Sequence, residues 1–122
     1  MMKKVKLPIA TVSESNKREH WTVSHKRHKS QKFQTRIGLL EEHIPQKLPV
    51  KITLTRYSPR KLDDDNLRGA LKYIRDAVAE HFITGKAPGR ADDDPRMTWD
   101  YSQIKHSCKY VMVTFQWSDC DV

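Results

Sequence analysis

Apolar residues recur with two different spacings along this chain, and each spacing predicts a type of secondary structure. Steps of three and four residues mark one buried face of a helix. One such set is Phe33, Ile37, Leu40 and Ile44. A second set is Leu67, Leu71, Ile74, Val78 and Phe82. We therefore predict a helix over about residues 26–43 and another that ends near residue 82, each with its apolar stripe in the core.

Steps of two residues predict strands, because successive side chains of a strand point to opposite faces. The predicted strands are residues 5–12, 50–55, 97–102 and 111–117. Pro8 favours an edge position for the first strand. The order strand, helix, strand, helix and strand pair predicts an α+β fold. We expect one compact domain over residues 1–122, with a small mixed β-sheet, helices packed over it and a C-terminal β-hairpin.

Basic and acidic residues are unevenly distributed along the chain. Residues 1–61 contain 15 Lys and Arg against 4 Asp and Glu, whereas residues 62–122 contain 8 against 11. The net charge of the whole chain is +8. Such a lopsided distribution favours binding of nucleic acid by the first half over a charge that serves solubility alone.

Cysteine content and hydropathy limit the cellular setting. Cys108 and Cys120 are too few for a disulfide framework or a zinc site. No apolar run approaches the ~18 residues of a membrane-spanning helix, and no signal peptide is recognisable at the start. We therefore expect a protein of the reducing cytoplasm, with no membrane partner and no organic cofactor.

Three consecutive aspartates, Asp63, Asp64 and Asp65, lie just before the second predicted helix and directly behind Arg60 and Lys61. Asp64 or Asp65 could cap the first turn of that helix. Capping needs one carboxylate, however, and several carboxylates together repel unless a cation joins them. Mg²⁺ suits this role, because it binds one or two carboxylates together with waters and phosphate oxygens. Helix caps in a solvated acidic loop and a metal site both stay open at this point.

An extended backbone would select two of the three aspartates as metal ligands. Residues two apart on an extended chain point to the same side, so Asp63 and Asp65 would converge and Asp64 would point away. A second acidic run, Asp92 to Asp94, follows the helix and a turn rich in Gly and Pro that returns the chain. Carboxylates from separate elements are typical of a metal-dependent phosphodiesterase.

These motifs resemble those of the RusA family of Holliday junction resolvases, many of them encoded by phages and prophages. The run from Asp63 to Leu67 is similar to that family's Asp-x-Asp-Asn-Leu motif. Lys72, Asp76-Ala77, the acidic turn and a terminal hairpin then follow in the family's order. Similar features of the opening segment are Leu7-Pro8, Ser15-Asn16 and Arg18-Glu19-His20-Trp21. The resemblance therefore extends over most of the chain.

The resemblance implies Mg²⁺-dependent nicking of four-way DNA junctions by a homodimer, through paired symmetric cuts, in DNA recombination and repair. It also implies a metal-binding set made of the two motif aspartates and one aspartate of the acidic turn. In this chain that set is Asp63, Asp65 and Asp93, with Asp92 and Asp94 as alternatives in register. Whether one or two Mg²⁺ ions bind stays open.

The catalytic lysine of the family pattern stands four residues after the second motif aspartate, where this chain has Gly69. Lys72 lies seven residues after Asp65, which returns it to nearly the same helix face, about 10 Å further along the axis. It also precedes Asp76 by four residues, as the family lysine does. We predict that Lys72 is catalytic and stabilises charge on the phosphate. Arg68 is the alternative, and a surface pair with Asp76 is the structural explanation.

Basic side chains are predicted to contact the DNA phosphates. These residues are Arg18, Lys26, Arg27, Lys29, Lys32, Arg56, Arg60, Lys61 and Arg68. Arg56, Arg60 and Lys61 have a second explanation, since they could serve only to neutralise the acidic cluster.

Two functions of different classes follow. One is a Mg²⁺-dependent, structure-selective DNA endonuclease. The other is a non-catalytic, basic nucleic-acid-binding module whose aspartates cap a helix and face solvent. Metal-dependent cleavage of branched DNA would distinguish the two.

Overall fold

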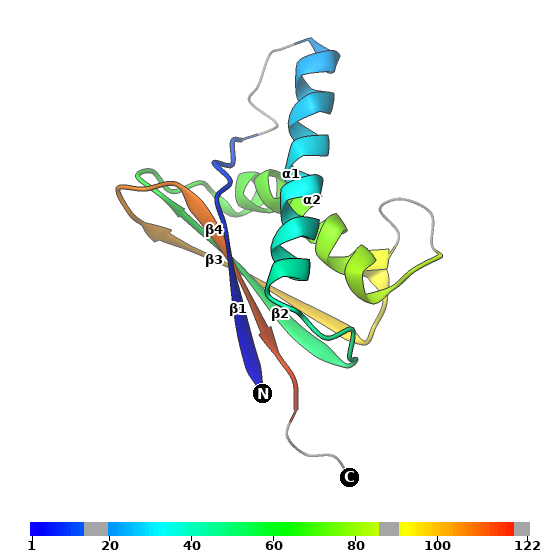
Figure 1. The fold of residues 1–122 in the computed structure, drawn as a ribbon. Helices are drawn as coiled ribbons and strands as arrows, with labels where there is room; N and C mark the ends of the chain where they lie inside the picture. Colours follow the sequence, from blue (N-terminus) through cyan, green and yellow to red (C-terminus); the bar gives the residue numbers. More distant parts are fainter. Residues whose placement is uncertain (14–19, 86–90, 119–122) are drawn as a thin grey trace.

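A computed structural model describes residues 1–13, 20–85 and 91–118 of the chain. Its elements in order are β1 (Met2–Leu7), α1 (Trp21–Glu41), β2 (Val50–Ser58), α2 (Asp64–Phe82), the short 3-10 helix η2 (Ala91–Asp93), β3 (Met97–Lys105) and β4 (Tyr110–Gln116). Figure 1 shows a four-stranded sheet with two long helices against it. The predicted α+β fold is confirmed.

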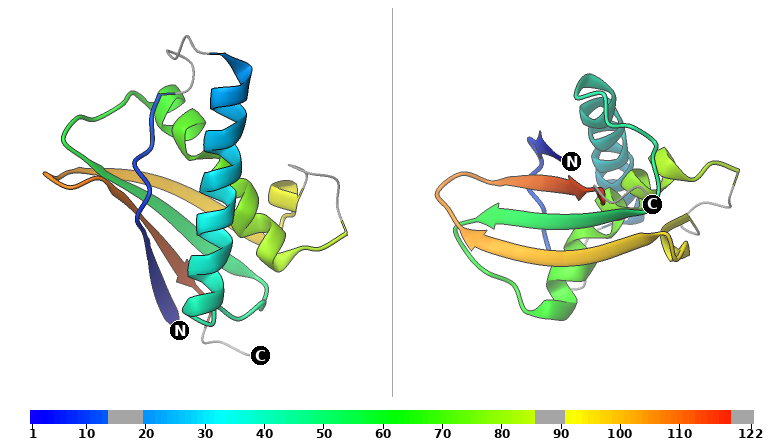
Figure 2. Two further views of the ribbon diagram at one scale, coloured as in Figure 1. Left: turned by 45° about the horizontal axis from the view of Figure 1, so that its top comes forward. Right: turned by 90° about the horizontal axis from the view of Figure 1, so that it is seen from below.

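The strands form one mixed sheet in the order β1-β4-β2-β3. β2 pairs in parallel with β3, through the crossover helix α2, and antiparallel with β4. β3 and β4 are joined by a short turn and run in opposite directions, and β2 lies between them and pairs with both (Figure 2). β2 is thus a central strand, and the segment that leaves its end leads directly into the acidic run.

Both helices cover one face of the sheet, and the other face is open (Figure 2). The predicted apolar stripe of α2 is confirmed, because Leu67, Leu71, Ile74, Val78 and Phe82 are all buried. Apolar side chains of the strands meet this stripe. The most completely buried of them are Val5, Leu7, Ile52, Leu54, Val111, Val113 and Phe115. The core therefore lies between α2 and the covered face of the sheet.

The predicted stripe of α1 is wrong, because most of it is on the surface. Phe33 and Leu40 are 62% and 63% exposed, and only Ile44, beyond the helix end, is buried. The buried residues of α1 are Gln31, Thr35 and Leu39. Gly38 explains the rotation: a Cβ there would lie 2.7 Å from Leu7 Cδ2, so its absence lets this side of the helix approach β1 closely.

The boundaries of β1 and α1 differ most from the prediction. β1 covers Met2–Leu7 and ends at Pro8, which has no N–H to donate to a ladder. α1 begins at Trp21, earlier than predicted, because the His20 side chain accepts a hydrogen bond from Thr22 N and caps the helix. No helix in the described ranges is long and apolar enough to span a membrane.

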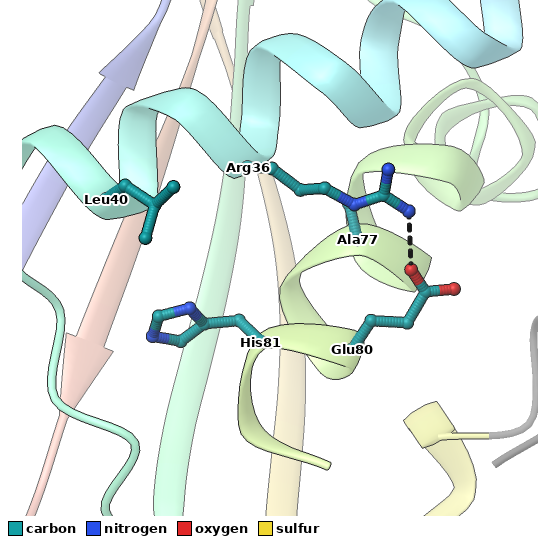
Figure 3. A pocket seen from close by; sticks show the side chains of 5 residues that line it. All are labelled: Arg36, Leu40, Ala77, Glu80 and His81. Carbon is teal, nitrogen blue, oxygen red and sulfur yellow. Dashed lines mark hydrogen bonds and ion pairs between the residues drawn. The ribbon is translucent and has the colours of Figure 1, made fainter. Parts of the chain in front are cut away.

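Polar contacts fix α1 against α2. Figure 3 shows Arg36 reaching from α1 to Glu80 of α2, at 2.8 Å, and Lys32 also pairs with Glu80, at 3.3 Å. Burial would raise the pKa of Glu80, but the hydrogen bond from Arg36 and the charge of Lys32 together lower it. The His28 ring stacks on Tyr73 with 3.7 Å between ring centroids. These contacts hold the basic helix α1 alongside the helix that carries the acidic run.

Candidate catalytic and nucleic-acid-binding site

Two strands fix the segment that enters α2. On β3, the Gln103 amide accepts from Leu62 N at 2.9 Å and donates to Leu62 O at 2.6 Å. On β2, Arg56 donates to the backbone oxygen of Arg60 at 2.7 Å. Ser13 donates to Asn66 Oδ1 at 3.0 Å from the segment after β1. The acidic run therefore begins at a backbone position that side chains from three parts of the chain hold in place.

Asp63 is the N-cap of α2, and its carboxylate accepts from Asn66 N at 3.1 Å. Two predictions are therefore wrong: Asp64 and Asp65 do not cap the helix, and the three aspartates do not alternate on an extended chain. The physical reason is that the cap starts the helix at Asp64. From there each residue turns by about 100° around the axis, so Asp63 and Asp65 diverge.

Asp64 and Arg68 face β3. Together with Asp100 and Tyr101 they line a cavity of about 290 Å³. The Arg68 guanidinium lies 5.6 Å from the centroid of the Tyr101 ring. Asp100 is already paired with a lysine, Lys51, at 3.3 Å.

Asp65 and Lys72 are both exposed on α2, about 20° apart around its axis, and Arg68 lies about 40° from Lys72. The helix is continuous from Asp64 to Phe82, so two turns separate these residues and their side chains leave the same face. Of the two predicted cations, Lys72 therefore shares the face of Asp65, whereas Arg68 shares the cavity with Asp64.

The three aspartates of the acidic turn differ in their ion pairs. Asp92 accepts from Arg75 Nε at 2.8 Å, and Asp94 accepts from Arg96 at 2.9 Å. Asp93 is exposed and has no ion pair with any described residue. Among the three register alternatives, Asp93 therefore has the carboxylate that is left to bind a cation.

Arg75 is the residue of this region that the sequence did not single out. Besides Asp92 it donates to the Tyr101 hydroxyl at 2.7 Å, and its guanidinium lies 4.6 Å from the Trp99 ring centroid. Trp99 also donates to the backbone oxygen of Asp92 at 3.2 Å. Arg75 thus ties α2, η2 and β3 together. Its only signal in the sequence is a basic residue among apolar ones in a helix that precedes an acidic run.

Asp76 is a buried carboxylate, only 6% exposed, one turn after Lys72. Burial raises its pKa and the nearby charge of Asp92 raises it further, while Lys32 and Lys72 oppose the shift. Asp76 has no hydrogen bond or ion pair with a described residue, so the predicted surface pair with Lys72 is not formed. The two lysines act on it only through their charge.

Mg²⁺ fits part of the predicted ligand set. In the ranges that the structure describes, no three His, Cys, Asp or Glu side chains are grouped closely enough to hold a metal ion. The start of α2 offers exposed carboxylates that form no ion pair with the described part of the chain, which suits an ion held by one or two carboxylates plus water and phosphate oxygens. Asp93 is not grouped with them in the structure: its neighbour Asp92 is paired with Arg75, which lies ten residues, or about 15 Å, further along α2 than Asp65.

The predicted DNA-binding residues occupy three places. Lys26 and Lys29 are exposed and Arg27 is partly exposed on the first half of α1, which extends beyond the sheet (Figure 1), while Lys32 is paired with Glu80. Arg60 and Lys61 are exposed beside the acidic run, and Arg56 is buried. Arg18 lies outside the described residues.

Comparison of the chain with protein-family models and with curated proteins gave no match.

Proposed function

We propose that this protein is a Mg²⁺-dependent, structure-selective endodeoxyribonuclease that resolves four-way DNA junctions by paired symmetric nicks, in recombination and repair. One observation carries the proposal: the start of α2 has exposed carboxylates that form no ion pair with a described residue, on a fixed backbone, with Arg60 and Lys61 on one side and Lys72 on the face of Asp65. Negative charge that forms no ion pair with a described residue, placed within a basic molecule, suits a metal ion that a phosphate also binds.

A carboxylate of Asp63 or Asp65 would hold the Mg²⁺ together with water and phosphate oxygens, and Asp93 is the third residue that the family resemblance implies, although the structure does not group it with them. Bound there, the ion would supply a water of lowered pKa and polarise the phosphate. Lys72 would place its ammonium group near the phosphate and stabilise the negative charge that grows on it. In this proposal Arg68 belongs to the β3 cavity and contributes to DNA binding.

The basic residues of α1 would bind the arms of the junction. Lys26 and Lys29 are exposed on the half of the helix that stands clear of the sheet, and Trp21 is 70% exposed at its start. Lysines contact phosphates without reading sequence, and an exposed indole can stack on an unpaired base. We place the activity in the cytoplasm or nucleoid of a bacterial host.

The exposed apolar residues of α1 support the proposed homodimer. Phe33, Ile37 and Leu40 follow each other at helical spacing on one side of α1, and all three are exposed. In a two-fold dimer the same patch lies on both subunits, so an apolar helix face can bury itself against its own copy. Two active sites related in this way could cut two symmetric strands of a junction.

The non-catalytic module is the second candidate, and the role of Asp63 favours it. A carboxylate that caps α2 already has a structural task, and carboxylates at a helix N-terminus interact favourably with the dipole without a metal.

The test is incubation of the protein with an end-labelled synthetic four-way junction and with a linear duplex, in Mg²⁺ or in EDTA. We expect symmetric nicks in the junction only, and only with Mg²⁺. Binding without nicking in either buffer would favour the module.

A further inference from the structure

Arg56 is a buried charge within the row of side chains that β2 points toward the core. It is 6% exposed, and in the sheet it lies between Val111 on β4 and Gln103 on β3. Burial lowers the pKa of its guanidinium, and no carboxylate of a described residue opposes the shift. An isolated charge at such a position is costly unless an anion accompanies it.

The hydrogen bonds of Arg56 leave part of its guanidinium unused. Nε donates to Thr11 Oγ1 at 2.9 Å and one terminal nitrogen donates to the backbone oxygen of Arg60 at 2.7 Å. A guanidinium carries five N–H donors in a planar fork that matches two oxygens of a phosphate. Among the described residues, no further acceptor takes the remaining N–H groups.

Arg56 lines a cavity of about 330 Å³ together with two other basic residues. Its charged residues are Arg56, Arg60 and Lys109, and the hydroxyls of Thr11 and Ser58 also line it. Its described lining contains no Asp or Glu. The cavity lies where the parallel strands β2 and β3 end, the edge at which open sheets with parallel strands commonly bind ligands.

We infer that this cavity is a phosphate-binding site in which Arg56 binds the anion and Arg60 and Lys109 close around it. Leu62, which also lines the cavity, directly precedes Asp63, so the bound phosphate would sit beside the start of α2. The ligand class is a phosphodiester of a nucleic-acid strand, held next to the phosphate that is cut. This choice of ligand rests on the proposed nuclease function, whereas affinity for phosphate does not.

The test is an NMR titration of the full chain that follows the Arg56 Nε–H signal, at constant ionic strength and without metal. The probes are inorganic phosphate and a short deoxyoligonucleotide with internal phosphodiesters and no terminal phosphate. We expect both to shift the signal. Arg60→Ala and Lys109→Ala should each weaken binding about tenfold, since each removes one charge-assisted contact. Lys4→Ala and Lys105→Ala are the matched controls, because both lysines are exposed and neither lines the cavity.

The outcomes separate this site from the nuclease activity. If the control variants weaken probe binding equally, the probes respond to the overall positive charge of the protein, and the proposed site is wrong. Binding of inorganic phosphate alone would overturn its assignment to a nucleic-acid strand. Tight, variant-sensitive binding of both probes by a protein that cuts no junction would support the site and reject the nuclease. Junction cutting by a protein whose Arg56 signal neither probe shifts would do the reverse.

Discussion

Asp63 has two possible tasks at the start of α2, and single substitutions separate them. Its carboxylate caps the helix through Asn66 N, and the proposed function also needs its negative charge. Asparagine caps a helix about as well as aspartate does, whereas alanine does not cap it.

We predict that Asp63→Asn abolishes Mg²⁺-dependent cleavage and leaves the melting temperature nearly unchanged. Asp63→Ala should lose activity and also about 1 kcal/mol of stability, a fall of about 4 °C for a domain of this size. Thermal unfolding and junction cleavage, measured on both variants, check this. Full activity of Asp63→Asn would show that Asp63 caps the helix and has no catalytic role.

The second residue-scale prediction concerns Asp76 and pH. Because the folded pKa of Asp76 is raised, the folded state binds the proton more tightly than the unfolded state does. Its contribution to stability is therefore most favourable at acid pH and falls as pH rises from the unfolded pKa of about 3.9 through the folded value. Asp76→Asn should be more stable than the wild type at neutral pH, and the difference should shrink toward pH ~4.

Urea unfolding of both proteins across this pH range measures the effect. Glu80→Gln, which removes a carboxylate whose pKa is lowered, serves as the control and should be less stable than the wild type at neutral pH. A stability difference between Asp76→Asn and wild type that is independent of pH would mean that the buried charge is not its cause.

At the scale of elements, the polar side chains in the first half of α2 point in different directions. Asp64 and Arg68 face the cavity against β3, and Asp65 and Lys72 share another face. A lysine at position 69 would also lie one turn from Asp65, and a Cβ there would meet nothing within 4 Å.

We predict that Lys72→Ala lowers the single-turnover cleavage rate by more than about tenfold, or 1.4 kcal/mol of transition-state stabilisation, with little change in melting temperature. Adding Gly69→Lys to this variant should restore part of the rate, because the new ammonium group leaves the same side of α2. Lys4→Ala, an exposed lysine on β1, is the control. If Arg68→Ala is the slow variant and Lys72→Ala is not, the catalytic charge belongs to Arg68.

The two helices show what hydrophobic spacing can and cannot predict. For α2 the apolar stripe is also the buried face, so sequence was sufficient. For α1 a periodic apolar stripe exists, but Gly38 lets another face approach β1, and a polar residue such as Thr35 is buried instead. Thr35 can be buried because its hydroxyl donates to Gln31 O at 2.7 Å. The spacing of apolar residues predicts which face of a helix is apolar. It does not predict that this face is buried when another face of the same helix can pack against the sheet, as in α1.

For the whole molecule, the exposed stripe of α1 predicts association. Phe33→Glu or Leu40→Glu should convert a dimer into a monomer in sedimentation experiments, since each would bury a charge in an apolar contact. Ile104→Glu, on a residue that is 44% exposed on β3, should leave the dimer intact. A wild-type protein that is monomeric at all concentrations would contradict the proposed interface.

The candidate site was only partly predictable from sequence. The acidic runs, Lys72 and the basic first half are visible as motifs, because they depend on residue type and spacing. The cap at Asp63 depends on where the backbone enters the helix. The ion pair between Arg75 and Asp92 depends on a contact between segments that are distant in the sequence. Those features follow from the fold, and spacing alone does not encode them.

The central claim is that the Asp65 side of α2 performs metal-dependent cleavage of branched DNA. Its most direct test compares wild type and Asp65→Asn on one labelled four-way junction, with the cleavage rate measured in Mg²⁺ and the affinity measured in EDTA. We predict that the variant binds at least as tightly, because an acid that repels phosphate is gone, and that its cleavage falls to background. Cleavage by Asp65→Asn at the wild-type rate, or loss of binding in parallel with cleavage, would contradict the claim.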